Sequence, residues 1–281
     1  MIAVTERSAP LILCIGHSGL RIPPAIDKRL SATGRLQADA SWHMDQLVDF
    51  AEEIQATVIS TPVSRIVVDV DGDPASFGRP FEDGALSICP VMTLDGKQIY
   101  LPNENPGRFE MDERRRLYHV PFHDALSAQI KRLRAIHGRI TVINLQSMRS
   151  RIKGRYPGDL PLVNIGTLHG RSCHEDVASL SMTMLYDFTD KTFSENDAVS
   201  GGYIAQTYGD PSGGVHVLTL ALALRAYIRH ENPPFELDRE RARQTRLALR
   251  NLCQKLIEWA NGKRKAPARV LLDHLPDLLE G

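Results

Sequence analysis

The sequence has few aromatic residues and cysteines, no excess charge of either sign, and no long apolar run. Phe, Trp and Tyr make up 6% of the 281 residues, and the cysteines are scattered without a C-x-x-C pair. This scatter argues against a zinc knuckle or disulfide framework and predicts a cytoplasmic protein. Lys plus Arg equals Asp plus Glu at 34 each, so no global field favours nucleic acid or an anionic membrane. No stretch reaches the roughly 18 apolar residues of a membrane span.

Well-known catalytic motifs are also missing. The chain contains no G-x-S-x-G, no P-loop, no H-E-x-x-H and no dinucleotide-binding fingerprint. No single short motif therefore identifies a reaction. The interpretation depends instead on the order of the polar residues around the expected strands.

The apolar pattern predicts an α/β fold with helices on both faces of a mixed, mostly parallel sheet. Continuous apolar runs predict buried strands, and apolar residues at a spacing near 3.6 predict helices. The expected strands are 11–16, 57–61, 65–70 and 139–145, and the expected helices are 39–56, 110–135 and 239–262. We expect one domain over 1–262, followed by a tail, 263–281. That tail is either a solvated segment or a short docking helix.

Several polar residues follow the expected strands. His17 stands in a turn that is flanked by glycines. It could be a metal ligand, a general base or a structural residue of the turn. Asp39 and His43 lie four apart at an expected helix start, where Asp39 could equally be the helix cap. Arg149 lies just beyond the strand 139–145 and suits the clamping of a carboxylate, unless it is solvated.

Two further stretches add candidates of lower specificity. Asp69, Asp71 and Asp73 alternate at the end of an apolar run and could bind a cation, although an Asx-turn is the default interpretation. Glycine pairs at 201–202 and 213–214 surround Tyr203 and lead to His216, which is typical of a binding loop.

Taken in order, these stretches resemble the N-formylglutamate amidohydrolase (deformylase) family over roughly residues 10–260. The stretches that carry the resemblance are GHSGLRIPPAI, ADASWHMDQLVDFAEEI, SRIVVDVD, LDGKQIY, PFHDAL, INLQSMRSR, LPLVNIGT, GGYIAQTYGDP, VHVLTLAL and PPFELD. The resemblance implies a zinc carboxypeptidase-like architecture. It also implies zinc-dependent cleavage of the formyl amide of N-formyl-L-glutamate.

The chain departs from the family pattern at the positions that carry the chemistry. His17 matches the family's first metal ligand, but Ser41 replaces the second acid of D-x-D-W-H. Asn144 and Gln146 stand where the family has the Asp and His of D-x-H-S, and Ala221 stands where we expect the general base. Because a hydroxyl and an amide are poor zinc ligands, zinc as the cofactor is in doubt for this chain.

We therefore interpret the chain as a divergent family member with a lost or altered zinc site. Its cleft is expected to bind a small acylated amino acid or a peptide terminus. The expected ligand-binding residues are Arg65, Asn144, Gln146, Arg149, Tyr203 and His216.

Two alternatives stay open. One is an active amidohydrolase with a rebuilt metal site, in which His43, Asp39, Asp69 and Asp71 join His17. The other is a non-catalytic protein partner that regulates another enzyme.

Overall fold

The computed structural model describes residues 2–76, 87–154, 156–186, 188 and 193–262. Within these ranges, seven strands form one sheet in the order β1-β3-β2-β4-β7-β5-β6. Their bounds are Ala3–Thr5 (β1), Leu11–Ile15 (β2), Thr57–Ser60 (β3), Ile140–Met148 (β4), Val163–Gly166 (β5), Phe193–Glu195 (β6) and Val215–Ala223 (β7). The expected tail, 263–281, lies outside the described residues.

The sheet is mixed and mostly parallel, as the sequence predicts. Strands β3, β2, β4 and β7 run parallel to one another, and β6 runs parallel to β5. Antiparallel pairing occurs only between β1 and β3 and between β5 and β7 among the described strands. Strands β2 and β7 are buried along their whole length, because helices cover both faces, and this explains their continuous apolar sequence.

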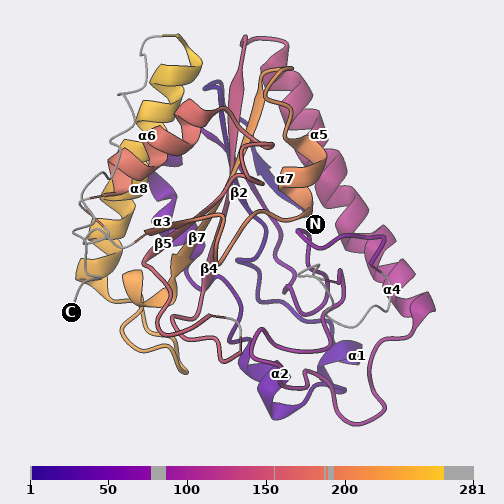
Figure 1. Ribbon diagram of the computed structural model, residues 1–281. Coiled ribbons are helices and arrows are strands. Elements are labelled where there is room, and N and C mark those ends of the chain that lie inside the picture. Colours follow the sequence, from indigo (N-terminus) through magenta and orange to yellow (C-terminus); the bar gives the residue numbers. More distant parts are fainter. Residues whose placement is uncertain (1, 77–86, 155, 187, 189–192, 263–281) are drawn as a thin grey trace, which may run out of the picture.

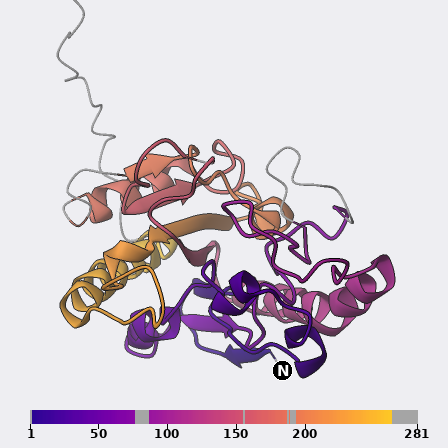
Figure 2. The ribbon, with the colours of Figure 1, turned by 90° about the horizontal axis from the view of Figure 1, so that it is seen from below.

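Helices pack on both faces of the sheet (Figure 1). One face carries α3 (Met44–Leu47), α6 (Glu175–Leu185) and α8 (Arg239–Ala260), and the other carries α5 (Val120–Arg134) and α7 (Tyr203–Tyr208). Seen from below, α8 and α5 lie on opposite sides of the molecule (Figure 2). Each face has its own apolar cluster, which includes Trp259 on the α8 side and Phe122 on the α5 side.

The long helix predicted over 110–135 is present, but a π-helical segment interrupts it. Helix α4 (Arg108–Arg114) continues into η2 (Arg115–His119), which is π-helical, and then into α5. Pro121 has no N–H and its ring would crowd the carbonyl four residues earlier, so a widened turn here lets the helix continue. The π-helical segment ends at His119, which faces the candidate site described below.

Two predicted elements differ in the structure. Residues 65–70 are buried but form a turn and an extended segment instead of a strand. Ser64 causes this, since its carbonyl accepts the N–H of Val67 and of Val68, and its hydroxyl accepts the N–H of Ile66. The helix predicted over 39–56 is broken into α3 and the 3-10 helix η1 (Asp49–Ala51).

The break in that helix is caused by tertiary contacts. His43 adopts a positive φ of 56° immediately before α3. Its Nε2 lies 3.0 Å from the carbonyl oxygen of Phe235, and the neighbouring Trp42 ring stacks on the Phe235 ring. The apolar spacing in the sequence is compatible with a continuous helix, so only these distant contacts reveal the break.

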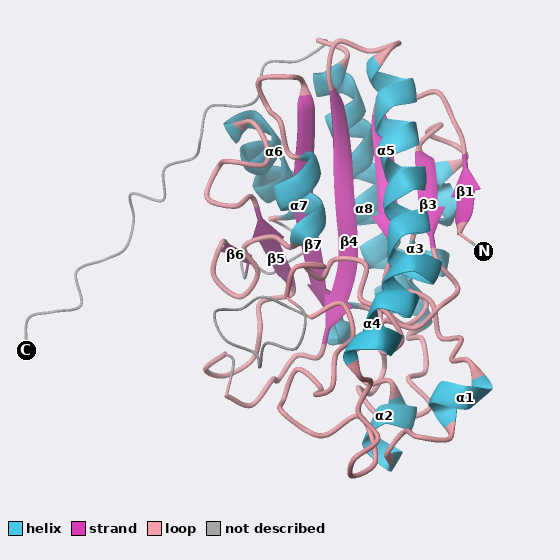
Figure 3. Ribbon diagram, turned by 90° about the vertical axis from the view of Figure 1, so that its right-hand side faces the viewer, coloured by secondary structure: helices cyan, strands magenta, loops and turns pink. Residues whose placement is uncertain are grey.

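Short helices and long loops gather beyond the carboxyl end of β2, where α1 (Pro24–Asp27) and α2 (Ala32–Leu36) lie (Figure 3). The 3-10 helix η3 (Leu224–Ala226) follows β7 directly. None of the helices in the described ranges combines the length and apolar character that a bilayer span requires.

Candidate functional site

The candidate site lies at the carboxyl ends of β2 and β4, on the face of the sheet that α5 and α7 cover. Because side chains alternate along a strand, Asn144 and Gln146 project to this face, whereas Ile143 and Leu145 join the apolar cluster of the other face. Ala221 pairs with Gln146 in register. Ligands of α/β proteins commonly bind at this end of the strands.

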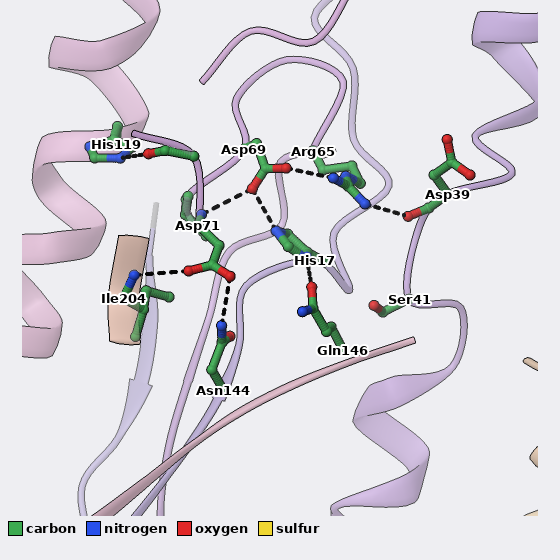
Figure 4. Close-up of polar contacts among 12 residues, drawn as sticks. His17, Asp39, Ser41, Arg65, Asp69, Asp71, His119, Asn144, Gln146 and Ile204 are labelled. Carbon is green, nitrogen blue, oxygen red and sulfur yellow. Dashed lines mark hydrogen bonds and ion pairs between the residues drawn. The ribbon is translucent and has the colours of Figure 1, made fainter. Parts of the chain in front are cut away.

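His17 is the centre of a buried hydrogen-bond network (Figure 4). The residue is 2% exposed. Its Nδ1 lies 2.9 Å from Oε1 of Gln146, and its Nε2 lies 2.7 Å from Oδ1 of Asp69. Both ring nitrogens are therefore engaged by neighbouring side chains, and the Asp69 carboxylate is the anionic one of the two partners.

Asp69 holds a second cation as well. Its Oδ2 lies 2.6 Å from Nη2 of Arg65, and the Asp69 side chain is completely buried. Burial alone would raise the pKa of the Asp69 carboxyl, but the charges of His17 and Arg65 outweigh it and lower the pKa below its ordinary value. Arg65 also donates from Nη1 to the carbonyl oxygen of Asp39. Arg65 therefore links the Asp69 carboxylate to the backbone of Asp39.

Asp71 fixes the start of α7. Its Oδ1 accepts the backbone N–H of Ile204, and its Oδ2 accepts Nδ2 of Asn144 at 2.8 Å. A side chain at Gly202 would collide with this carboxylate, which explains the glycine there. Burial, together with the negative charge of Asp69, raises the pKa of Asp71 to about 6.

The alternating aspartates form the Asx-turns of the default interpretation. Asp69 Oδ1 accepts the N–H of Asp71, and Asp73 Oδ1 accepts the N–H of Ala75, as in Asx-turns. The same turns place the carboxylates of Asp69 and Asp71 in the network around His17.

Arg149 forms a second charged group just beyond the end of β4. Its Nε and Nη2 donate to Oδ1 of Asp39 at 3.1 and 2.9 Å, and its Nη2 also contacts Oδ1 of Asp95 at 2.8 Å. Leu94 donates its backbone N–H to the other oxygen of Asp39. The loop that carries Asp95 is thus attached to both Asp39 and Arg149.

Ser41 and Ala221 are the two remaining positions at which the chain departs from the family pattern, and both are buried. The hydroxyl of Ser41 accepts the N–H of Ser147, whose own hydroxyl accepts the phenol of Tyr227 at 2.7 Å. Ser41 and Ala221 are both 0% exposed. Ser41 therefore supports the backbone at the end of β4, and Ala221 offers only a methyl group.

These residues do not fit the zinc site that the family resemblance implies. Zinc needs about three His, Cys or carboxylate ligands with free lone pairs. Both nitrogens of His17 are engaged by Gln146 and Asp69, and either orientation of the Gln146 amide engages Nδ1. Across the described ranges, no three His, Cys, Asp or Glu side chains lie close enough together to hold a metal ion.

The structure likewise does not assemble the rebuilt metal site considered above. His43 contacts Phe235 through Nε2 and Gln46 through Nδ1. The Oδ1 atom of Asp39 is bound to Arg149. Asp39 and His43 thus do not join His17 as ligands, and Asp69 and Asp71 are held by hydrogen bonds to other parts of the chain.

Tyr203 and His119 form the wall next to Asp71. Tyr203 donates its N–H to the carbonyl oxygen of Asp71, and its ring centre lies 5.5 Å from that of His119. Nε2 of His119 lies 3.2 Å from the carbonyl oxygen of Gly72. Burial lowers the pKa of His119, which favours its neutral form. Tyr203 thus lies next to the network around His17.

His216 lies elsewhere. It is the second residue of β7 and pairs in register with Thr141 near the start of β4. It is therefore about five residues from Ala221, or roughly 16 Å along the strand. His216 contacts Trp259 of α8, so it belongs to the opposite end of the sheet from His17.

His119 and Asp95 are not among the site residues predicted from the sequence. The spacing of His119 and His123, four residues apart, is a signal for two imidazoles on one helix face, and their rings lie 4.2 Å apart. Asp95 lies in an irregular loop 54 residues from its partner Arg149, and no sequence periodicity connects them.

The chain is similar to known proteins over most of its length. Residues 9–228 match the model of the N-formylglutamate amidohydrolase family. The chain is 30% identical over 251 residues to an N-formylglutamate deformylase of Pseudomonas putida, covering 89% of this chain and 93% of that protein. It is also 30% identical over 250 residues to an N-formylglutamate deformylase of Pseudomonas aeruginosa, with the same shares covered.

Solved structures share the fold. An N-formylglutamate amidohydrolase from Ralstonia eutropha JMP134 superposes with a TM-score of 0.77 at 20% identity, covering 94% of this chain and 99% of the other. A gene product of Agrobacterium tumefaciens superposes with a TM-score of 0.67 at 18% identity, covering 92% and 95%.

Proposed function

This chain belongs to the N-formylglutamate amidohydrolase family, and we propose that it binds a small acylated amino acid without zinc-dependent hydrolysis. The observation that carries this proposal is the double engagement of His17 by Gln146 and Asp69. A metal could bind His17 only by displacing one of these two partners.

The position at which the family's general base is expected provides no group for the proton transfers of amide hydrolysis. A general base must lie within hydrogen-bond reach of the water or the leaving group. Ala221 occupies the family position where we expect that base, and its methyl group can neither accept nor release a proton. Asp69 is fixed between two cations and has a lowered pKa, so it is a poor base at neutral pH.

Three donors remain for a ligand. Within the ranges that the structure describes, no protein group accepts from Nε2 of Gln146, Nη1 of Arg149 or the hydroxyl of Tyr203. All three residues are accessible to solvent in part. Such donors suit an acyl oxygen and a carboxylate. Arg65 and Asn144 instead bind Asp69 and Asp71, so they stabilise the network and do not bind the ligand.

Calorimetry tests this function. The ligands are N-formyl-L-glutamate, N-formyl-L-glutamine and their N-acetyl counterparts, with unmodified L-glutamate as the reference. We expect saturable binding of at least one acylated ligand. Gln146→Ala should weaken it by roughly three- to tenfold through the loss of a hydrogen bond. Gln244→Ala is the matched control, because Gln244 is exposed on α8 and its side chain hydrogen-bonds to Glu240.

Formate release from the two formyl ligands is measured in parallel with added zinc, with the Pseudomonas putida deformylase as the positive control. We expect no release by this chain. Zinc-dependent turnover would contradict the proposal, and so would the failure of every acylated ligand to bind the folded protein.

A further inference from the structure

The site's cations are already paired with carboxylates of the chain. Arg65 binds Asp69, and Arg149 binds both Asp39 and Asp95. His17 contributes the remaining positive charge and also binds Asp69. Asp71 adds a further carboxyl group to the same network. Acidic side chains are therefore at least as numerous as cationic side chains in it.

Asp95 lies where a ligand's carboxylate would bind Arg149. It is on a compact turn in which Gly96, with φ of 80°, donates its N–H to Thr93. The hydroxyl of Thr93 lies 2.6 Å from Oδ1 of Asp95, and Nζ of Lys97 lies 3.0 Å from Oδ2. The Arg149 contact, followed by those of Thr93 and Lys97, lowers the pKa of Asp95, so this carboxylate is ionised at neutral pH.

The turn is attached at two points and is therefore a defined part of the site. Asp95 contacts Arg149, and Leu94 donates its N–H to Asp39, which is itself bound to Arg149. The side chains of Arg149, Asp39 and Asp95 are 14%, 12% and 10% exposed. A ligand that reaches Arg149 therefore meets Asp95 at the same guanidinium.

We propose that Asp95 is a specificity-determining residue that occupies the carboxylate position at Arg149. The site then selects acylated amino acids with an uncharged polar side chain over dicarboxylates such as N-formylglutamate. This inference rests on the proposed function. A second carboxylate would have to displace Asp95 or lie against it, and like charges in contact at a binding site oppose association. An amide side chain can accept from Nη1 of Arg149 and donate to Asp95.

N-formyl-L-glutamate and N-formyl-L-glutamine test the inference, because they have nearly the same shape and differ in side-chain charge. Calorimetry on the wild-type protein should show N-formyl-L-glutamine binding roughly tenfold more tightly. This comparison needs no variant and so carries no risk of misfolding. Equal or tighter binding of N-formyl-L-glutamate would overturn the inference and leave the proposed function in place.

The Asp95→Asn variant tests whether Asp95 causes the preference for N-formyl-L-glutamine. It removes the charge and keeps the size, so the preference for N-formyl-L-glutamine should shrink or reverse. Asp159→Asn is the control, because Asp159 is exposed and pairs with Arg151, and it should preserve the wild-type ratio. An unchanged ratio in Asp95→Asn with a wild-type melting temperature would overturn the assignment of Asp95. If none of the acylated ligands binds any of these proteins, the proposed function fails as well.

Discussion

Two buried histidines at opposite ends of the sheet have opposite surroundings. His17 is 2% exposed and His216 is 3% exposed. The nitrogens of His17 face oxygen atoms of Gln146 and Asp69, whereas Nδ1 of His216 accepts the backbone N–H of His174. The His216 ring packs on Trp259. Burial, followed by His174 and two nearby arginines, lowers the pKa of His216 to about 4.

The two rings share their burial and differ in their neighbours. His17 contacts a carboxylate and an amide, whereas burial together with the nearby cations favours the neutral form of His216. Both histidines follow glycines in the sequence, and both could be site residues by that criterion. Only the end of the sheet that holds His17 combines several charged groups in one network.

The largest effect is expected for Asp69→Asn, which removes the anion shared by His17 and Arg65. Breaking a buried ion pair on one side leaves uncompensated charge and typically costs about 3–5 kcal/mol. Urea unfolding at neutral pH measures the loss of free energy of unfolding. Asp49→Asn is the matched control, because Asp49 pairs with Arg246 at the surface. A loss no larger than the control's would contradict a charged network around His17.

A pH-dependent effect is expected at His216. The unfolded chain takes up a proton below about 6.5, and the folded chain does so only below a pKa of about 4. Stability therefore falls as the pH falls through this window, by about 3 kcal/mol at most. His216→Asn keeps an acceptor for His174 and cannot titrate, so its unfolding free energy should fall less steeply between pH 7 and pH 4.

Thermal or urea unfolding across this pH range separates the titration from lost packing, because the packing loss is the same at every pH. His230→Asn serves as the control, since His230 is exposed. Parallel pH profiles for wild type and His216→Asn would show that His216 is not held neutral by its surroundings.

The smallest effect is expected for Asn144→Ala, and its pH dependence has the opposite sign. Folding raises the pKa of Asp71 to about 6, so this group's contribution is fully present below about pH 4 and is lost as pH rises through 6. The Asn144 amide supports the ionised form. Its removal should cost about 1 kcal/mol at pH 8 and less at pH 5. Urea unfolding at both values tests this, and a larger loss at pH 5 would contradict the assignment.

Much of the fold was predictable because local pattern and tertiary structure agree. Buried parallel strands need continuous apolar sequence, which 11–16 and 139–145 have, and both become strands. The segment 65–70 has the same pattern, but Ser64 redirects its backbone into a turn. Similarly, the contacts of Trp42 and His43 with Phe235 break a helix that periodicity alone predicts.

The site was predictable only where residues follow strand ends. Gln146 and His17 could be identified as neighbours, because parallel strands end at the same edge of a sheet. The roles of Arg65 and Arg149 could not be identified in this way, since their partners Asp69 and Asp95 are fixed by loop geometry. An arginine in a sequence does not reveal whether its charge is already paired within the chain.

The most direct test of the central claim is the zinc content of the full-length protein, expressed with added zinc and purified without chelator. His17→Gln, which retains hydrogen-bonding capacity, is measured beside it. The metal-free network around His17 predicts no stoichiometric zinc in either protein. Stoichiometric zinc in the wild type that is lost in His17→Gln would contradict it, and would show that the ring exchanges Gln146 and Asp69 for a metal.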